Sequence, residues 1–234
     1  MGSDTPRILL LHGLAATGAV WIPVLERLRG AAQATAPDLL GHGTARRSAA
    51  YDLPALAAAL ADHRADILVG HSLGGYVALA LAGGSYGAPP RTVLSLGAKQ
   101  CFTPDERAKA AELARRPARR FATRAEALER YRLVSGLNVT IAPDEALLAR
   151  GIGVEADGYA LATDPMVLGI DVAPFAELVT QAGCPVVLGR GEHDPLVSAA
   201  EQASLGRPTV EFDGCGHNVH VEDPAAVARL IMSL

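Results

Sequence analysis

The stretch of sequence best suited to covalent chemistry is residues 70–75, which read GHSLGG. A serine hydroxyl becomes a nucleophile when a neighbouring base accepts its proton. The apolar run at residues 66–69 predicts a strand before this motif, and residues 73–81 predict a helix after it. A sharp turn between them requires small residues two positions before and after the serine, where Gly70 and Gly74 stand. The pattern therefore predicts a nucleophile, Ser72, at a helix start, where free N–H groups favour negative charge.

A base for this serine should come from a loop that follows a later strand. Residues 213–217, which read DGCGH, follow the predicted strand at residues 209–212, and their two glycines allow a sharp turn. We predict His217 as the general base, because imidazole has a pKa near neutrality and can accept and return a proton. His220 is the rival, but it lies toward the final predicted helix and is expected to support the loop.

The acid that orients this base should follow the preceding strand. Residues 189–195, which read GRGEHDP, come directly after the predicted strand at residues 185–188. Asp194 is preferred over Glu192, because it stands at the expected loop tip before a proline and its short side chain can be held rigidly. Ser72, Asp194 and His217 then follow one another in the chain order that the nucleophile-turn motif requires.

An acyl-transfer site also needs two N–H donors for the oxyanion that develops during attack. The backbone N–H of Leu73, the residue after the serine, is the first candidate. The second should come from the loop after the first predicted strand, where Leu14 is the best placed residue. His12, at the start of that loop, is expected to be structural.

The composition suits one domain that holds these loops in place. The chain has 234 residues, of which 50% are apolar, enough for one substantial core. Its net charge of −4 gives no reason to expect nucleic acid or an anionic membrane as a partner. We expect a small-molecule substrate, with the protein a monomer or a homodimer.

We expect a cytoplasmic protein, because the sequence shows no targeting signal and few cysteines. Residues 1–6 contain no basic segment of the kind that begins a signal peptide, and no apolar run approaches the roughly 20 residues that span a bilayer. Three cysteines without a CxxC pair argue against a disulfide framework and a zinc site. We expect no metal and no cofactor.

The elements that carry these loops alternate along the chain. Short apolar runs predict six strands, at residues 7–11, 32–36, 66–69, 92–96, 185–188 and 209–212. Predicted helices lie at residues 20–28, 53–63, 73–81 and 225–234. Strands that alternate with helices predict an α/β fold with a doubly wound, mostly parallel sheet of about six strands.

One interval breaks this alternation, because almost ninety residues separate Leu96 from Cys184. We predict a mainly helical cap at residues 98–167, inserted into a core made of residues 1–97 and 168–234. Within the cap, helix starts are expected near residues 103–106 and at Thr123, where Glu126 would complete a capping box. Residues 156–159 predict a tight turn.

Taken together, these motifs resemble the α/β-hydrolase superfamily over nearly the whole chain outside the cap. The matching segments are residues 11–13 (LHG) with Trp21 following, 37–43 (PDLLGHG), 70–75, 191–194 (GEHD) and 216–224 (GHNVHVEDP). The resemblance implies a serine triad and no cofactor. Dehalogenases of this superfamily use aspartate as the nucleophile and dienelactone hydrolases use cysteine, so Ser72 leaves hydrolysis of an ester, lactone, thioester or activated carbon–carbon bond. Members usually begin with an antiparallel hairpin that this chain lacks, which implies a sheet truncated to six strands.

Two other functions stay open. Residues 216–224 and the compact length also resemble the menaquinone-pathway synthase that eliminates pyruvate with the same triad. That lyase family usually has an arginine soon after the serine, whereas this chain has Tyr76. A non-catalytic small-molecule receptor is the third possibility, because fold alone does not fix function. Turnover of an ester would separate an enzyme from a receptor, and release of pyruvate would separate a lyase from a hydrolase.

Candidate substrate contacts are less clearly indicated by the sequence than the catalytic residues are. Lys99, just after the fourth predicted strand, is the best single polar candidate, and we add Tyr76 and Trp21. Seven arginines of the predicted cap either attract an anionic substrate or form a solvated helical face, which is the reading that we favour. They are Arg115, Arg116, Arg119, Arg120, Arg124, Arg130 and Arg132.

Overall fold

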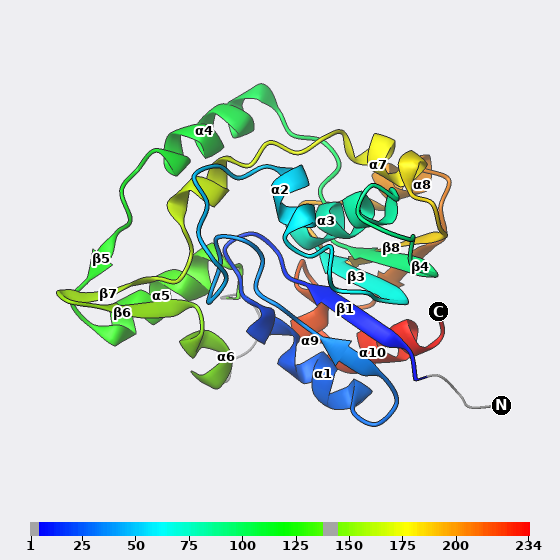
Figure 1. Ribbon diagram of the computed structural model, residues 1–234, viewed down its shortest axis with the longest axis horizontal. Coiled ribbons are helices and arrows are strands. Elements are labelled where there is room, and N and C mark those ends of the chain that lie inside the picture. Colours follow the sequence, from blue (N-terminus) through cyan, green and yellow to red (C-terminus); the bar gives the residue numbers. More distant parts are fainter. Residues whose placement is uncertain (1–4, 138–144) are drawn as a thin grey trace.

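The core of the protein is a six-stranded sheet in which every neighbouring pair of strands is parallel (Figure 1). The structure is a computed structural model that describes residues 5–137 and 145–234. Residues 1–4, which bear on the expected absence of a signal peptide, lie outside the described residues. The strand order is β2-β1-β3-β4-β8-β9, and the predicted doubly wound parallel sheet of about six strands is confirmed. The strands are β1 (Arg7–Leu11), β2 (Gln33–Thr35), β3 (Ile67–His71), β4 (Thr92–Leu96), β8 (Val186–Gly191) and β9 (Thr209–Phe212).

Helices cover both faces of this sheet, which is why its central strands are apolar throughout. On β1, Ile8 and Leu10 point into one core cluster with α1 (Ile22–Leu28) and α10 (Pro224–Met232). Leu9 and Leu11 point into a second cluster with α2 (Leu53–Ala58), α3 (Leu73–Ala82) and α7 (Phe175–Gln181). This alternation along one strand places a separate hydrophobic core on each face.

Some helices differ from the sequence-based expectation. The predicted helix at residues 53–63 ends as α2 at Ala58, after which the N–H of Leu60 bonds to Ala57 and that of Ala61 to Ala58, in tighter turns. The predicted helix at residues 20–28 begins with a 3₁₀ turn, η1 (Gly18–Trp21). In the core, three short helices, α7, α8 (Ala199–Ser204) and α9 (Val219–Glu222), had no prediction because each is too short for a clear apolar period.

Between β4 and β8 the chain leaves the sheet and forms a second layer at the left of Figure 1. We call residues 98–167 the insert. Capping boxes begin two of its helices, at Thr103 with Glu106 and at the predicted Thr123 with Glu126. The predicted turn at residues 156–159 joins two strands of a three-stranded antiparallel sheet. The elements of the insert are α4 (Pro104–Ala114), β5 (Arg120–Phe121), α5 (Arg124–Val134), α6 (Glu145–Ala149), β6 (Ile152–Glu155) and β7 (Gly158–Leu161). The turn η2 (Pro165–Gly169) begins within the insert and ends just after it.

The insert is attached to loops at the carboxyl ends of the core strands. His42 and Thr163 form an isolated antiparallel bridge, and the N–H of Asp164 donates to the carbonyl of Gly41 at 2.8 Å. The Tyr51 hydroxyl donates to the Asp164 carboxylate, also at 2.8 Å. These contacts fix the insert beside the edge of the sheet where the predicted site residues gather.

Among the described residues, no helix is both long and apolar enough to cross a bilayer.

Candidate active site

Ser72 stands in a strained turn between β3 and α3. Its backbone has φ 51° and ψ −116°, a conformation that non-glycine residues rarely adopt, and its N–H donates to the carbonyl of Leu96 at 2.8 Å. A Cβ on Gly70 would lie 2.1 Å from the carbonyl oxygen of Gly74, and one on Gly74 would lie 2.2 Å from that of Leu11. The two glycines are therefore required by the backbone on either side of the turn, as the sequence pattern indicates.

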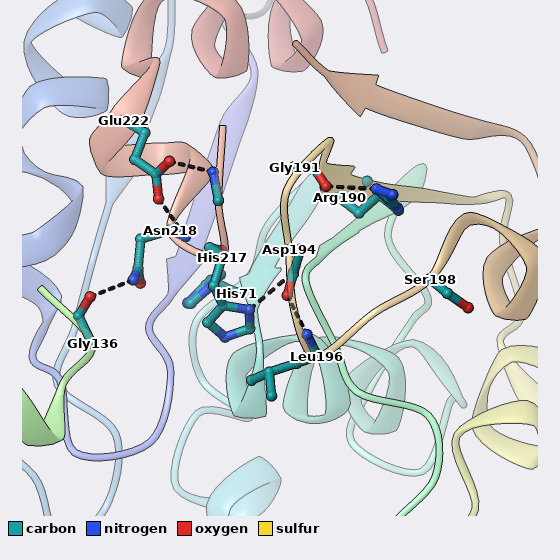
Figure 2. Close-up of polar contacts among 12 residues, drawn as sticks. His71, Gly136, Arg190, Gly191, Asp194, Leu196, Ser198, His217, Asn218 and Glu222 are labelled. Atoms are coloured by element: carbon teal, nitrogen blue, oxygen red, sulfur yellow. Dashed lines mark hydrogen bonds and ion pairs between the residues drawn. The ribbon is translucent and has the colours of Figure 1, made fainter. Parts of the chain in front are cut away.

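His217 and Asp194 are joined by a hydrogen bond (Figure 2). His217 Nδ1 lies 3.0 Å from Asp194 Oδ2, and the Asp194 side chain is fully buried whereas that of His217 is 20% exposed. The other carboxylate oxygen of Asp194 accepts the N–H of Leu196 at 2.8 Å. A carboxylate can only accept, so Nδ1 is the donor in this bond. In the neutral ring, Nε2 then carries the lone pair that can accept a proton.

Two glycines show how closely the loops approach one another. A Cβ on Gly97, which follows β4, would lie 3.2 Å from both Asp194 Oδ2 and His217 Cε1. A Cβ on Gly13, which follows β1, would lie 3.3 Å from the Cβ of Ser72. The loops after β1, β3, β4, β8 and β9 therefore meet at the carboxyl edge of the sheet, where parallel α/β proteins bind their ligands.

Two glutamates hold the loop that carries His217. Glu222 accepts the N–H of Gly216 and, at 3.0 Å, that of Asn218, so one carboxylate holds the backbone on both sides of the histidine (Figure 2). Glu192, which we considered as the orienting acid, accepts the N–H of Gly214 at 2.8 Å. Sequence reasoning missed Glu222. Its only signal was a carboxylate five residues after the histidine, which many surface loops share.

Asn218 connects this loop to the insert. Its side-chain amide donates to the carbonyl of Gly136, just after α5, at 2.9 Å (Figure 2). The residue beside His217 is thus bonded to the insert while its own N–H is bonded to Glu222. The position of Asn218 in the sequence did not indicate this contact.

His71 and His220 form a buried aromatic cluster with Trp21 behind His217. The ring of His220 lies 4.4 Å from those of both Trp21 and His71, and His71 lies 4.7 Å from His217. His71 Nε2 donates to the His217 carbonyl at 2.9 Å. Burial lowers the pKa of His220 to about 3 and that of His71 well below its usual value, so both rings are neutral. The hydrogen bond to Asp194 is made by His217, whereas His220 packs beneath the loop.

The two candidate oxyanion donors lie on loops of defined structure. Leu73 is the first residue of α3, and the first N–H groups of a helix have no partner within it. Leu14 is 37% exposed, and the next residue, Ala15, has φ 60° with its N–H bonded to Nε2 of His42 at 3.2 Å. His12 is fully buried and accepts the N–H of Leu39 at 2.9 Å, which agrees with a structural role. The donor roles of Leu14 and Leu73 stay predictions.

The predicted substrate contacts lie in different surroundings. Lys99 forms an ion pair with Glu106 at 2.5 Å, and 24% of its side chain is exposed. Tyr76 is buried against Phe175, and its hydroxyl donates to the carbonyl of Lys99. Trp21 is fully buried in the core cluster. Tyr76 and Trp21 therefore belong to the hydrophobic core in this structure. Contact of Lys99, Tyr76 or Trp21 with a substrate stays a prediction.

A pocket of about 250 Å³ lies between the insert and the loop after β1. Its walls are mostly apolar, and three arginines of the insert, Arg116, Arg119 and Arg130, line it. Among the residues that the structure describes, no group of three or more His, Cys, Asp or Glu side chains is placed to hold a metal ion.

Comparisons with known proteins find related sequences and the same fold. The family model described as "Alpha/beta hydrolase family" matches residues 8–230. The chain is 29% identical, over 97% of its length, to 2-(acetamidomethylene)succinate hydrolase of Mesorhizobium japonicum, and the match covers 86% of that protein. It is 40% identical to lipase LipV of Mycobacterium tuberculosis over 34% of its length, so this match spans only about a third (33%) of that protein. The solved thioesterase domain from the curacin biosynthetic pathway has the same fold, with a TM-score of 0.79 at 20% identity, over 98% of this chain and 91% of that one.

Proposed function

Because the chain belongs to the alpha/beta hydrolase family, we propose that it is a serine hydrolase of small carboxylic esters or chemically related acyl compounds. Ser72 is the nucleophile, His217 the general base and Asp194 the residue that orients it. The observation that carries this proposal is the 3.0 Å bond between His217 Nδ1 and the buried carboxylate of Asp194, at the sheet edge where the strained Ser72 turn lies. Homologous proteins include hydrolases, which supports the same reaction class.

The reaction proceeds in two steps that use the same residues. In the first, the oxygen of Ser72 bonds to the substrate carbonyl carbon while His217 takes the hydroxyl proton. The tetrahedral oxyanion is stabilised by the N–H groups of Leu73 and Leu14. His217 then gives its proton to the leaving group as the bond to that group breaks. In the second step, His217 activates water, which attacks the acyl-enzyme and releases the acid and Ser72.

The substrate range follows from this chemistry and from related proteins. Esters, lactones and thioesters all present a carbonyl with a suitable leaving group, and an activated carbon–carbon bond would need a stabilised carbanion to leave. The insert covers the edge of the sheet as a cap and shapes the acyl site. This cap position is supported by the bonds from Asn218 to Gly136 and from Asp164 to Gly41, which join the insert to the loops of the site.

The test of this proposal is turnover of p-nitrophenyl esters of increasing acyl length by the wild type and by Ser72→Ala. We expect the variant to lose kcat by about 10⁴-fold or more, because the nucleophile is removed. Ser85→Ala is the matched control, since Ser85 is exposed and lies outside the site, and it should keep full activity. Turnover that survives in Ser72→Ala, or a folded wild type without turnover, would overturn the proposal. Release of pyruvate, followed in parallel on a suitable substrate, would indicate the lyase instead.

A further inference from the structure

The pocket between the insert and the core is lined by apolar side chains together with three arginines. We call it the insert pocket. It is lined by Ala15 from the core and, from the insert, by apolar side chains that include Leu113 and Phe121, together with Arg116, Arg119 and Arg130. Its lining residues, in the described part of the chain, include no aspartate or glutamate. Three arginines thus line a mostly apolar space that has no acidic side chain in its wall.

The three arginines differ in the partners that their guanidinium groups contact. Arg116 pairs with Glu112 one turn away at 2.6 Å, and both side chains are more than 60% exposed. Arg119 lies over the ring of Phe121, with its guanidinium carbon 5.0 Å from the ring centre. Arg130 is half-buried on α5, and no ion pair joins it to a carboxylate among the described residues. A partly buried guanidinium favours a carboxylate or phosphate partner, which it can bind through two parallel hydrogen bonds.

On the core side, the wall of the insert pocket belongs to the loop that also lies against Ser72. Ala15 lines the pocket, and two residues earlier Gly13 lies against Ser72. His42 fixes this loop by accepting the N–H of Ala15, and its bridge partner Thr163 is also part of the pocket wall. A substrate whose carbonyl lies at Ser72 and whose acyl chain passes this loop would therefore place the end of that chain in the insert pocket.

The insert pocket has room for a short chain with a polar end. Its volume is about 250 Å³, close to the roughly 300 Å³ at which small-molecule sites in proteins begin.

We propose that the insert pocket binds the end of the substrate remote from the scissile bond, and that this end is an anion, such as a carboxylate, on a short apolar chain. Arg130 is its principal partner, with Arg119 and Arg116 at the rim. The inference rests on the proposed function and adds a substrate class to it. The surplus positive charge around the pocket then has a role in selecting substrates, whereas the sequence alone favours a solvated helical face.

The experiment compares two esters with six-carbon acyl chains that differ in their ends. Mono-p-nitrophenyl adipate ends in a carboxylate, and p-nitrophenyl hexanoate ends in a methyl group. We expect the wild type to have a kcat/KM at least about tenfold higher for the adipate, as a charge-assisted hydrogen bond implies. Arg130→Gln should remove most of that preference while changing kcat/KM for the hexanoate less than about twofold. Arg119→Gln is the second variant, in case Arg130→Gln does not fold.

Arg115→Gln is the matched control, because it removes one charge from an exposed residue of the same insert that does not line the pocket. Equal losses in Arg115→Gln and Arg130→Gln would indicate long-range attraction alone and overturn the inference. Turnover of the hexanoate without a preference for the adipate would also overturn it, while the proposed function would stand. If the folded protein hydrolysed neither ester, the proposed function would fail. Calorimetric binding of monomethyl adipate to Ser72→Ala, with and without Arg130→Gln, would then decide whether the pocket binds an anion.

Discussion

At the scale of single residues, the position of His217 depends on groups that do not belong to the proposed triad. Glu222 accepts the N–H groups on either side of it, and His71 donates to its carbonyl. Asp194 fixes the ring from one nitrogen only. The backbone contacts therefore determine where the ring can lie, and the carboxylate determines which nitrogen keeps its proton.

The first prediction concerns Glu222 as a positioning residue. Glu222→Gln replaces one of two acceptor oxygens with an NH₂ group that faces an N–H donor, so the loop must shift. Because a displacement of about 1 Å can cost on the order of 100-fold in rate, we expect kcat to fall about 10- to 100-fold with KM changed less than about threefold. The measurement is steady-state hydrolysis of a p-nitrophenyl ester.

Glu177→Gln is the control for this prediction, because Glu177 is exposed on α7. If Glu222→Gln raised KM about 10- to 100-fold and left kcat unchanged, the residue would act in substrate binding. That result would contradict a role in positioning His217. Unchanged kinetics would show that the loop keeps its position without this carboxylate.

At the scale of elements, the site depends on the close packing of the turn before α3 against the end of β1. Gly74 faces the carbonyl oxygens of Leu11 and His12, where a Cβ would lie 2.2 and 2.8 Å away. Both oxygens belong to the backbone at the end of β1, a strand that is paired on both sides and has little freedom to move. The start of α3 and the strained turn of Ser72 are therefore set by contact with a neighbouring strand.

The second prediction follows from this contact. We expect Gly74→Ala to lower the free energy of unfolding by about 2–3 kcal/mol, as overpacking does, and to reduce ester turnover because the turn is displaced. Gly83→Ala is the control, since its nearest neighbour would lie at an ordinary 3.4 Å, and its stability should change by less than about 1 kcal/mol. Urea unfolding of both variants tests this. Equal stability of Gly74→Ala and the wild type would contradict the packing described here.

The same scale shows what the sequence could and could not predict. All six strands and the turn at Ser72 were predictable, because buried parallel strands are short apolar runs and the turn requires glycines at fixed positions. The strand β5, with two residues, has no period to detect, and it pairs with a strand almost forty residues away. Glu222, Asn218 and His71 also escaped prediction, because their roles arise from backbone groups that only the folded chain brings near.

At the scale of the whole molecule, the protein buries several histidines in neutral form. Burial lowers the pKa of His12 to about 3, that of His42 to about 4 and that of His220 to about 3. Each holds a loop at the carboxyl edge of the sheet or packs beneath one. In the unfolded chain the same side chains titrate near 6.5.

The third prediction is a loss of stability in mild acid. Below pH 6.5 the unfolded chain binds protons that the folded protein excludes until the pH reaches about 3 to 4, so falling pH favours unfolding across that window. Each histidine adds a slope of up to about 1.4 kcal/mol per pH unit, so the three together give a loss on the order of 4 kcal/mol between pH 7.5 and 5.5. Urea unfolding at pH 7.5, 6.5 and 5.5 measures it. A constant free energy of unfolding over this range would contradict the neutral, buried state of these rings.

The central claim is that Ser72 is the nucleophile that His217 and Asp194 activate. The most direct test is to incubate the folded protein with a fluorophosphonate, measure the intact mass, and map the modified residue by peptide mass spectrometry. We predict one adduct per chain, located on Ser72, absent in Ser72→Ala, present in Ser85→Ala, and formed much more slowly in Asp194→Asn because His217 then loses its orienting carboxylate. An adduct on another residue, or a folded wild type that does not react, would contradict the claim.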